Sequence, residues 1–120
     1  MAAAANDPIR TLFLCQYNQR RSATAERVFA KDPGLDVRSA GTSDEALVPV
    51  NQRMLEWADV VFVMEDRQRT ALARMFPGHP ALERVVCLDI RDDYHFLDPE
   101  LVTLLRDRTK PYLERLKQGG

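Results

Sequence analysis

Four short apolar segments recur along the chain, and each is followed by a longer segment with a different spacing. These segments cover residues 9–14, 35–40, 60–64 and 85–88; the second, LDVRSA, alternates apolar and polar residues, whereas the others are mostly continuous. The strongest of them reads VVFVM over residues 60–64, and five consecutive apolar positions are typical of a strand buried on both faces of a parallel sheet. We therefore predict four strands.

The segments between and after these strands carry apolar residues every three or four positions, which indicates amphipathic helices. We predict helices that begin at Ser22 as N-cap, near Val50, at Glu65-Asp66, and at Asp98-Pro99, where an N-cap precedes proline at the first helical position. Pro33-Gly34 and Pro77-Gly78 end the first and third helices. Pro111 is predicted to kink the last helix, which runs to Leu116.

Strands that alternate with helices predict an α/β fold, here a three-layer sandwich with helices on both faces of a four-stranded parallel sheet. Right-handed crossovers leave few topologies, and we favour the strand order 2-1-3-4. The order then reverses beside the carboxyl end of the first strand, where open α/β sheets bind ligands. We expect one domain over residues 8–120 and a disordered tail over residues 1–7.

The composition excludes several functional classes. A net charge of −1 argues against nucleic acid as a partner, and no segment has the length of a membrane span. The first residues lack the pattern of a signal peptide. Two cysteines without paired spacing predict neither a disulfide framework nor a metal site, so we expect a reducing cytoplasm and no metal or cofactor. We also expect the protein to be a monomer.

The loop between the first strand and the first helix carries the candidate chemistry. It reads CQYNQRRS over residues 15–22, the pattern C-x5-R-S. Backbone N–H groups at this place can surround an anion, and the helix dipole adds positive potential. The same environment favours a thiolate at Cys15, and Arg21 can hold two phosphoryl oxygens with its planar fork. Ser22 can donate its hydroxyl to the sulfur when Cys15 acts as a leaving group.

The phosphate-binding set predicted from this loop contains every residue after the cysteine: Gln16, Tyr17, Asn18, Gln19, Arg20, Arg21 and Ser22. Cys87 provides the contrast. It lies inside an apolar strand without a nearby cation, so we predict an inert, buried thiol there.

The segment LFLCQYNQRRSATAERVF over residues 12–29 resembles the phosphate loop and first helix of the low-molecular-weight protein tyrosine phosphatases. The similarity continues in SAGT at residues 39–42 and in ADVVFVME at residues 58–65, which is similar to the ADLILAMD of that family. The resemblance covers most of the chain and implies the same sheet order. It also implies that Asn18, in a left-handed conformation, braces the loop with help from Ser39.

Three departures from that family concern the substrate. The segment of residues 43–57 is shorter than the corresponding segment of that family, which supplies a wall of the pocket. The chain therefore resembles a truncated branch of the family. Arg20 replaces a cysteine that can form a protective disulfide, and Tyr17 replaces a small residue. Gln19 takes a position that, by analogy, helps to select phosphotyrosine or phosphoarginine. Arg20 either meets a second anionic group on the substrate or is a surface arginine.

A proton donor for the leaving group is predicted after the fourth strand. The resemblance, which implies an Asp-Pro-Tyr segment there, favours Asp92, with Asp93 in place of proline and Tyr94 matching the aromatic residue. Asp93 and Asp98 stay open as alternatives, although Asp98-Pro99 fits a helix cap better, and His95 is a further candidate.

The resulting hypothesis is a cysteine-dependent phosphomonoesterase with Cys15, Arg21 and Asp92 as catalytic residues. The favoured reaction is hydrolysis of phosphotyrosine on a protein through a phosphocysteine intermediate. A nucleotide, an RNA end, a sugar phosphate or phosphoarginine is the alternative substrate, and a non-catalytic phosphate-binding module is the alternative class. Arsenate reduction ranks low, because it usually needs two further cysteines and only Cys87 is present.

Overall fold

The computed structural model describes residues 7–118, with a parallel sheet at its centre. The strands are β1 (Ile9–Cys15), β2 (Leu35–Gly41), β3 (Val60–Val63) and β4 (Val85–Cys87). They lie in the order β2-β1-β3-β4 and every neighbouring pair is parallel, which confirms the predicted topology. The predicted tail lies outside the described residues, except for its last residue, Asp7.

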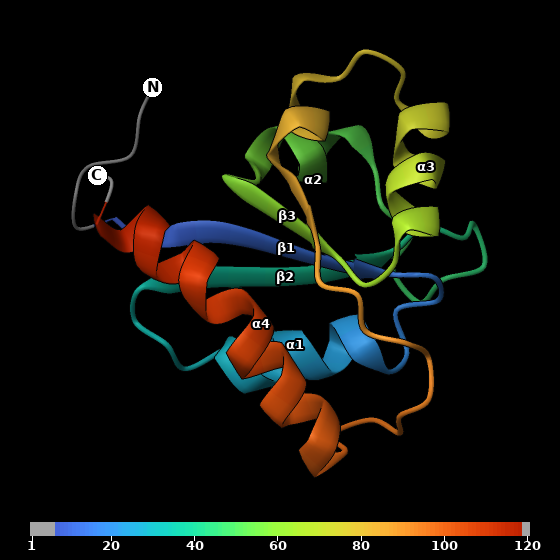
Figure 1. Cartoon of the computed structure of the whole chain (residues 1–120). Helices are drawn as coiled ribbons and strands as arrows, with labels where there is room; N and C mark the ends of the chain where they lie inside the picture. The colour runs from blue at the N-terminus through green and yellow to red at the C-terminus, as the bar shows by residue number, and fades with distance from the viewer. Residues whose placement is uncertain (1–6, 119–120) are drawn as a thin grey trace.

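Helices cover both faces of the sheet, as predicted (Figure 1). One face carries α1 (Arg21–Phe29) and α4 (Pro99–Gln118), and the other carries α2 (Gln52–Trp57) and α3 (Asp66–Met75). A short 3-10 helix, η1 (Pro80–Arg84), precedes β4 and was not predicted. The His79 imidazole caps it by accepting a hydrogen bond from the N–H of Ala81 at 3.0 Å.

The alternation of side chains along β1 divides the core into two layers. Phe13 belongs to the cluster under α1 and α4, where its ring stacks on Phe29 and Phe62 with centroid separations of 5.6 and 5.3 Å. Leu12 and Leu14 point to the opposite face and pack in the cluster that includes Leu55 of α2 and Leu72 of α3. Both faces of β1 are therefore buried, as the continuous apolar run indicates.

Two predicted helix starts are wrong by one or two residues. Helix α1 begins at Arg21, with Arg20 at the N-cap position, and Arg20 makes no capping side-chain bond. Ser22, the predicted N-cap, lies inside the helix, and its hydroxyl contacts Cys15 Sγ in the loop described below. Helix α2 begins at Gln52 rather than near Val50, since the Asn51 side chain accepts a hydrogen bond from the N–H of Met54.

The last helix begins close to its predicted start. The Asp98 carboxylate accepts a hydrogen bond from the N–H of Glu100 at 2.9 Å, which is a helix-capping contact. Pro111 lies inside α4, which continues to Gln118.

The order of the strands indicates where the sheet would bind a ligand. Strand β2 lies on one side of β1 and β3 on the other, so the chain leaves β1 at the point where the order reverses. The loop from β1 to α1 and the segment after β4 both emerge at this carboxyl edge, where open parallel sheets bind their ligands.

Candidate active site

A cavity of about 210 Å³ opens at this reversal point. Residues of the loop after β1 and one carboxylate from the segment after β4 line it: Cys15, Gln16, Tyr17, Gln19, Arg20, Arg21 and Asp92. All three predicted catalytic residues therefore meet in one cavity. Asn18, Ser22 and Ser39 do not line the cavity; they lie behind the loop and hold it in place.

The backbone of the loop turns its carbonyl groups toward the protein. The carbonyl oxygens of Cys15, Gln16 and Tyr17 accept hydrogen bonds from Thr42, Ser43 and Leu47 at 2.9, 3.0 and 3.1 Å. Among the described residues, no hydrogen bond is donated by the N–H groups of residues 17–20. These donors are left for a ligand, as in a ring of N–H groups that binds an anion.

Gly41 permits the close approach of this loop to β2. A Cβ atom at this position would lie 2.5 Å from the carbonyl oxygen of Gln16 and 2.5 Å from the Cβ of Ala46. The absence of a side chain is therefore required here, and the SAGT segment of the sequence is explained by packing against the loop.

A buried hydrogen-bond network fixes the loop from behind. Asn18 has a φ of 59°, and its side-chain amide donates to Ser22 Oγ at 2.8 Å and to Ser39 Oγ at 2.9 Å. The Ser22 hydroxyl lies 3.0 Å from Cys15 Sγ. Cys15 thus lines the cavity with its sulfur beside a hydroxyl that can donate to it.

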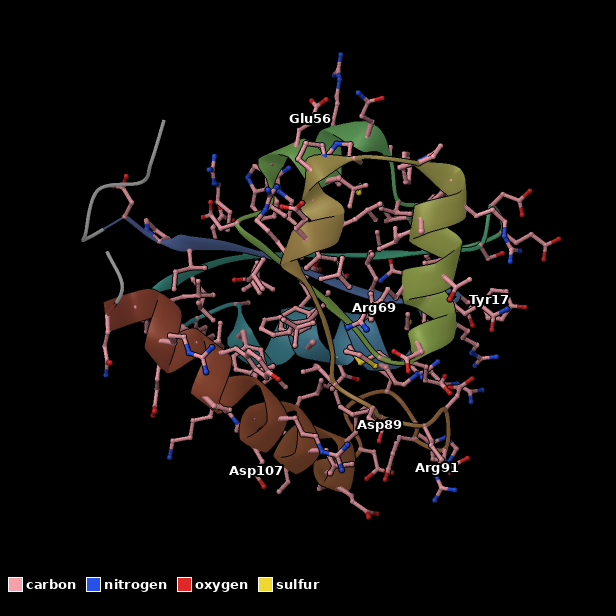
Figure 2. All side chains as sticks on the ribbon, turned by 45° about the horizontal axis from the view of Figure 1, so that its top comes forward. Tyr17, Glu56, Arg69, Asp89, Arg91 and Asp107 are labelled. Atoms are coloured by element: carbon pink, nitrogen blue, oxygen red, sulfur yellow. The ribbon has the colours of Figure 1, made fainter. Side chains whose placement is uncertain are left out.

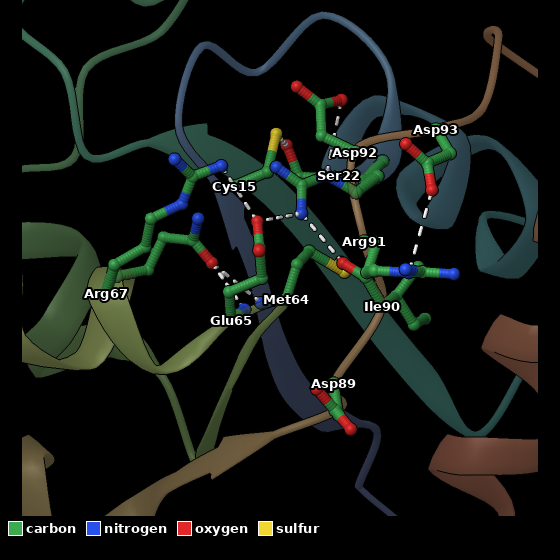
Figure 3. Close-up of polar contacts among 12 residues, drawn as sticks. Cys15, Ser22, Met64, Glu65, Arg67, Asp89, Ile90, Arg91, Asp92 and Asp93 are labelled. Carbon is green, nitrogen blue, oxygen red and sulfur yellow. Dashed lines mark hydrogen bonds and ion pairs between the residues drawn. The ribbon is translucent and has the colours of Figure 1, made fainter.

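Arg21 is the most deeply buried cation of this site, with 1% of its surface exposed. One terminal nitrogen donates to Glu65 Oε1 at 2.7 Å and to the carbonyl oxygen of Ile90 at 2.8 Å. A buried guanidinium is stable only when it is paired in this way. Figure 3 shows the Glu65 carboxylate at the centre of these contacts, and its pair with the outer Arg67.

Two arginines control the ionisation of Glu65. Burial raises its pKa, but hydrogen bonds from Arg21 and Arg67 outweigh that effect and hold the pKa below the usual 4.5. Glu65 is therefore a carboxylate that orients Arg21 rather than a proton donor.

The other side of the Arg21 guanidinium is available to a ligand. Its buried Nε atom has no hydrogen-bond partner, and Asp92 Oδ1 lies 3.7 Å from it, too far for a hydrogen bond. An orphaned donor that borders the anion cavity is the geometry expected of an arginine that binds phosphoryl oxygens.

The three candidate acids occupy different places. Asp92 lines the cavity, and its side chain is 43% exposed. Asp93 turns instead toward Arg91, at 3.6 Å, as Figure 3 shows. Asp98 caps α4. Neither Asp93 nor Asp98 lines the cavity, and His95 does not line it either.

Cys87 lies two strands away from the cavity and does not line it. Burial raises the pKa of its thiol above the usual 9.0. The thiol is only partly buried, but it is protonated at neutral pH, which agrees with the inert role predicted for it.

Sequence reasoning missed two groups of this site. Glu65 was interpreted only as the start of a helix, although it ends the ADVVFVME segment and so follows β3 at the carboxyl edge of the sheet. The Ile90 carbonyl that anchors Arg21 carries no signal in the sequence, since any residue type supplies a carbonyl oxygen.

Two negative findings hold for residues 7–118. No group of three or more His, Cys, Asp or Glu side chains is placed to hold a metal ion. No helix there is long and apolar enough to cross a membrane.

Solved structures that resemble this chain are phosphatases. The arginine phosphatase YwlE of Geobacillus stearothermophilus is 23% identical with a TM-score of 0.70, covering 92% of this chain and 97% of its own. The tyrosine phosphatase Wzb of Escherichia coli K30, solved with phosphate, is 20% identical with a TM-score of 0.72, covering 89% and 97%. A low-molecular-weight phosphotyrosine phosphatase of Vibrio cholerae O395 is 17% identical with a TM-score of 0.74, covering 93% and 99%.

The fold is that of the low-molecular-weight phosphatases. No protein-family model matches the chain, and no curated protein sequence does. At identities of 17–23%, the likeness to these phosphatases establishes the architecture, and the chemistry rests on the side chains of the cavity.

Proposed function

We propose that this chain is a cysteine-dependent phosphomonoesterase of the low-molecular-weight protein tyrosine phosphatase family. One observation carries the proposal: one cavity is lined by Cys15, by Arg21, whose Nε has no hydrogen-bond partner, and by Asp92. The fold and the C-x5-R-S loop add independent support.

The first half of the proposed reaction transfers the phosphoryl group to sulfur. The Cys15 thiolate attacks phosphorus while the bond from phosphorus to the leaving oxygen breaks. Arg21 and the N–H groups of the loop bind the three equatorial oxygens, where charge develops in the transition state. Asp92, in its protonated form, gives its proton to the leaving oxygen, so the product leaves as a neutral alcohol or phenol.

The second half returns the enzyme to its starting state. Asp92, now a carboxylate, takes a proton from a water molecule as that water attacks the phosphocysteine. The bond from sulfur to phosphorus breaks and inorganic phosphate forms. The Ser22 hydroxyl, 3.0 Å from the sulfur, donates to it and stabilises the departing thiolate.

The two cysteines provide a matched test of this proposal. We expect Cys15→Ser to lower kcat for p-nitrophenyl phosphate by roughly 10⁴-fold or more, as loss of a nucleophile does. Cys87→Ser is the control and leaves kcat within about twofold, because a partly buried thiol outside the cavity contributes only packing. Equal activity of the wild type and Cys15→Ser would contradict the proposal.

The substrate we propose is phosphotyrosine on a protein. We also propose that the enzyme is a monomer and that it acts in the cytoplasm. Phosphoarginine is a second candidate, supported by the likeness to the arginine phosphatase YwlE. Values of kcat/KM for matched peptides with phosphotyrosine or phosphoarginine, together with a nucleoside monophosphate, a sugar phosphate and an RNA 5′-phosphate, decide between these classes. Phosphopeptide binding without turnover would instead support a non-catalytic phosphate-binding module, and light scattering tests the monomer.

A further inference from the structure

A second cavity, of about 330 Å³, adjoins the first. Gln16 lines both of them, so the two cavities meet at the first residue after the nucleophile. The second cavity lies between the loop after β2 and the first turns of α3, and it is lined by Gln16, Thr42, Ser43, Arg67, Gln68 and Ala71. None of these residues is acidic, and the mechanism proposed above uses none of their side chains.

Gln68, which lines this cavity, has a side-chain hydrogen-bond donor without a partner. The residue is 1% exposed, and its Oε1 accepts from the N–H groups of Met64 at 3.1 Å and Glu65 at 2.6 Å. These two donors fix the orientation of the amide, because a flipped amide would turn its NH₂ toward them. Nε2 is left buried without a partner. A buried donor without a partner needs an explanation, and an acceptor on a bound ligand is one.

Arg67 supplies a cation at the mouth of the same cavity. Its side chain is 56% exposed, and one terminal nitrogen pairs with Glu65 Oε1 at 2.9 Å. That oxygen is shared with Arg21, so two guanidinium groups lie against one carboxylate. The remaining N–H groups of Arg67 are free for an oxyanion.

The hydroxyl groups of the loop complete a set of donors. Ser43 Oγ accepts a hydrogen bond from the N–H of Glu45 at 3.1 Å, which leaves its own proton free to donate. Thr42 adds a second hydroxyl. The carboxylates of Asp44 and Glu45 follow in the same loop, but neither lines the cavity. A cavity of donors and one cation suits a ligand rich in acceptor oxygens.

We propose that the cavity around Arg67 and Gln68 binds a second anionic group, a phosphate or a carboxylate, on the leaving group of the substrate. This inference rests on the proposed phosphatase function, which places the scissile phosphate in the adjoining cavity. The substrate class is therefore a phosphomonoester with a further oxyanion close to the ester, either on a small molecule or on an acidic residue next to a phosphorylated one.

The test measures a preference rather than an activity. Values of kcat/KM are compared for phenyl phosphate, 3-carboxyphenyl phosphate and 1,3-phenylene bisphosphate, and for phosphotyrosyl peptides with Asp or Ala beside the phosphotyrosine. We expect the wild type to prefer the substrate with the second anion by roughly tenfold, as one charge-assisted contact provides. Added NaCl reduces the preference, because Arg67 is exposed.

Arg69 offers a matched control for Arg67. Both lie on α3 and both pair with a carboxylate, but Arg69 pairs with Asp66 at 3.5 Å and does not line the cavity. Figure 2 shows Arg69 and Tyr17 on opposite sides of α3. We expect Arg67→Gln to reduce the preference to about unity and Arg69→Gln to keep it at roughly tenfold. Because Arg67 also contacts Glu65, each ratio is taken within one variant.

The outcomes separate this inference from the function on which it rests. A preference that disappears in Arg67→Gln alone supports the second site, and the arm in which it occurs, small molecule or peptide, identifies the source of the anion. Hydrolysis of all substrates without a preference, or an equal loss in both variants, overturns the second site and leaves the phosphatase proposal intact. Failure of the wild type to hydrolyse any of them contradicts the phosphatase proposal itself.

Discussion

Two segments meet at the cavity, and they are held in opposite ways. Residues 16–20, after β1, are five residues fixed by backbone hydrogen bonds to Ser43 and Leu47 and by the buried amide of Asn18. Residues 88–98, after β4, are tied mainly at their ends. Leu88 and Ile90 bond to β3 and the residue after it, and the N–H of Leu97 donates to Thr24 Oγ1 at 2.9 Å.

The middle of the second segment has little polar support. Within the described part of the chain, the ion pair of Asp92 with Arg21 is the one polar side-chain contact that residues 91–96 make outside their own segment. Figure 2 shows Tyr17 and Arg91, one from each segment, projecting from the same end of the molecule. In the proposed mechanism, the first segment holds the phosphate in a fixed ring, and the second brings a proton donor to it.

Arg21 joins the two segments, so its replacement should have the largest effect. Arg21→Lys keeps the charge but loses the planar fork that reaches Glu65, the Ile90 carbonyl and the phosphate together. We expect kcat/KM for p-nitrophenyl phosphate to fall by about 10²- to 10³-fold. Arg27→Lys, at the exposed end of the same helix, is the control. A fall of less than about fivefold for Arg21→Lys would show that the fork is not needed.

Asp92 tests the second segment alone. We expect Asp92→Asn to lower kcat by about 10²-fold for an alkyl phosphate, because an alkoxide needs a proton to leave. The effect should be smaller for p-nitrophenyl phosphate, whose leaving group is stable as an anion. Asp93→Asn is the matched control and should change neither rate. The reverse result, with Asp93 as the sensitive residue, would assign the proton donor to the other carboxylate.

Asn18 tests the support of the first segment. Asn18→Gly removes the hydrogen bonds to Ser22 and Ser39 but tolerates the φ of 59°, whereas Asn18→Ala adds the strain of a Cβ in the left-handed region. We expect a roughly tenfold fall in kcat for both variants. Chemical denaturation should show that the free energy of unfolding of Asn18→Ala is about 1 kcal/mol lower than that of Asn18→Gly. Equal stabilities would contradict the strain argument.

Thr24 tests the tether of the second segment, where we expect the smallest effect. Thr24→Val keeps the shape and removes the acceptor for the N–H of Leu97, which itself has a φ of 61°. The unfolding free energy should fall by about 1 kcal/mol, and kcat for an alkyl phosphate by roughly threefold. Thr109→Val is the control, because its buried hydroxyl bonds only to carbonyl groups within α4. An unchanged kcat would show that the tether does not position Asp92.

The sequence alone was sufficient for the frame of the molecule. The apolar runs at residues 12–14 and 60–64 are typical of strands buried on both faces of a parallel sheet, and they are buried here. Right-handed crossovers leave few topologies, and the favoured order is the one observed. The place of Cys15, Arg21 and Ser22 follows from the same local logic, since all three lie within eight residues of one strand-to-helix turn.

Contacts between distant segments were decided only by the tertiary structure. The sequence left Asp92, Asp93 and Asp98 open as proton donors, because a loop of irregular backbone does not reveal which side chain turns inward. The structure brings Asp92 to the cavity. It also pairs Arg21 with Glu65, 44 residues away, and leaves one nitrogen of Gln68 without a partner beside Arg67. Periodicity records which residues are buried, whereas the partner of a buried polar group depends on how separate elements pack.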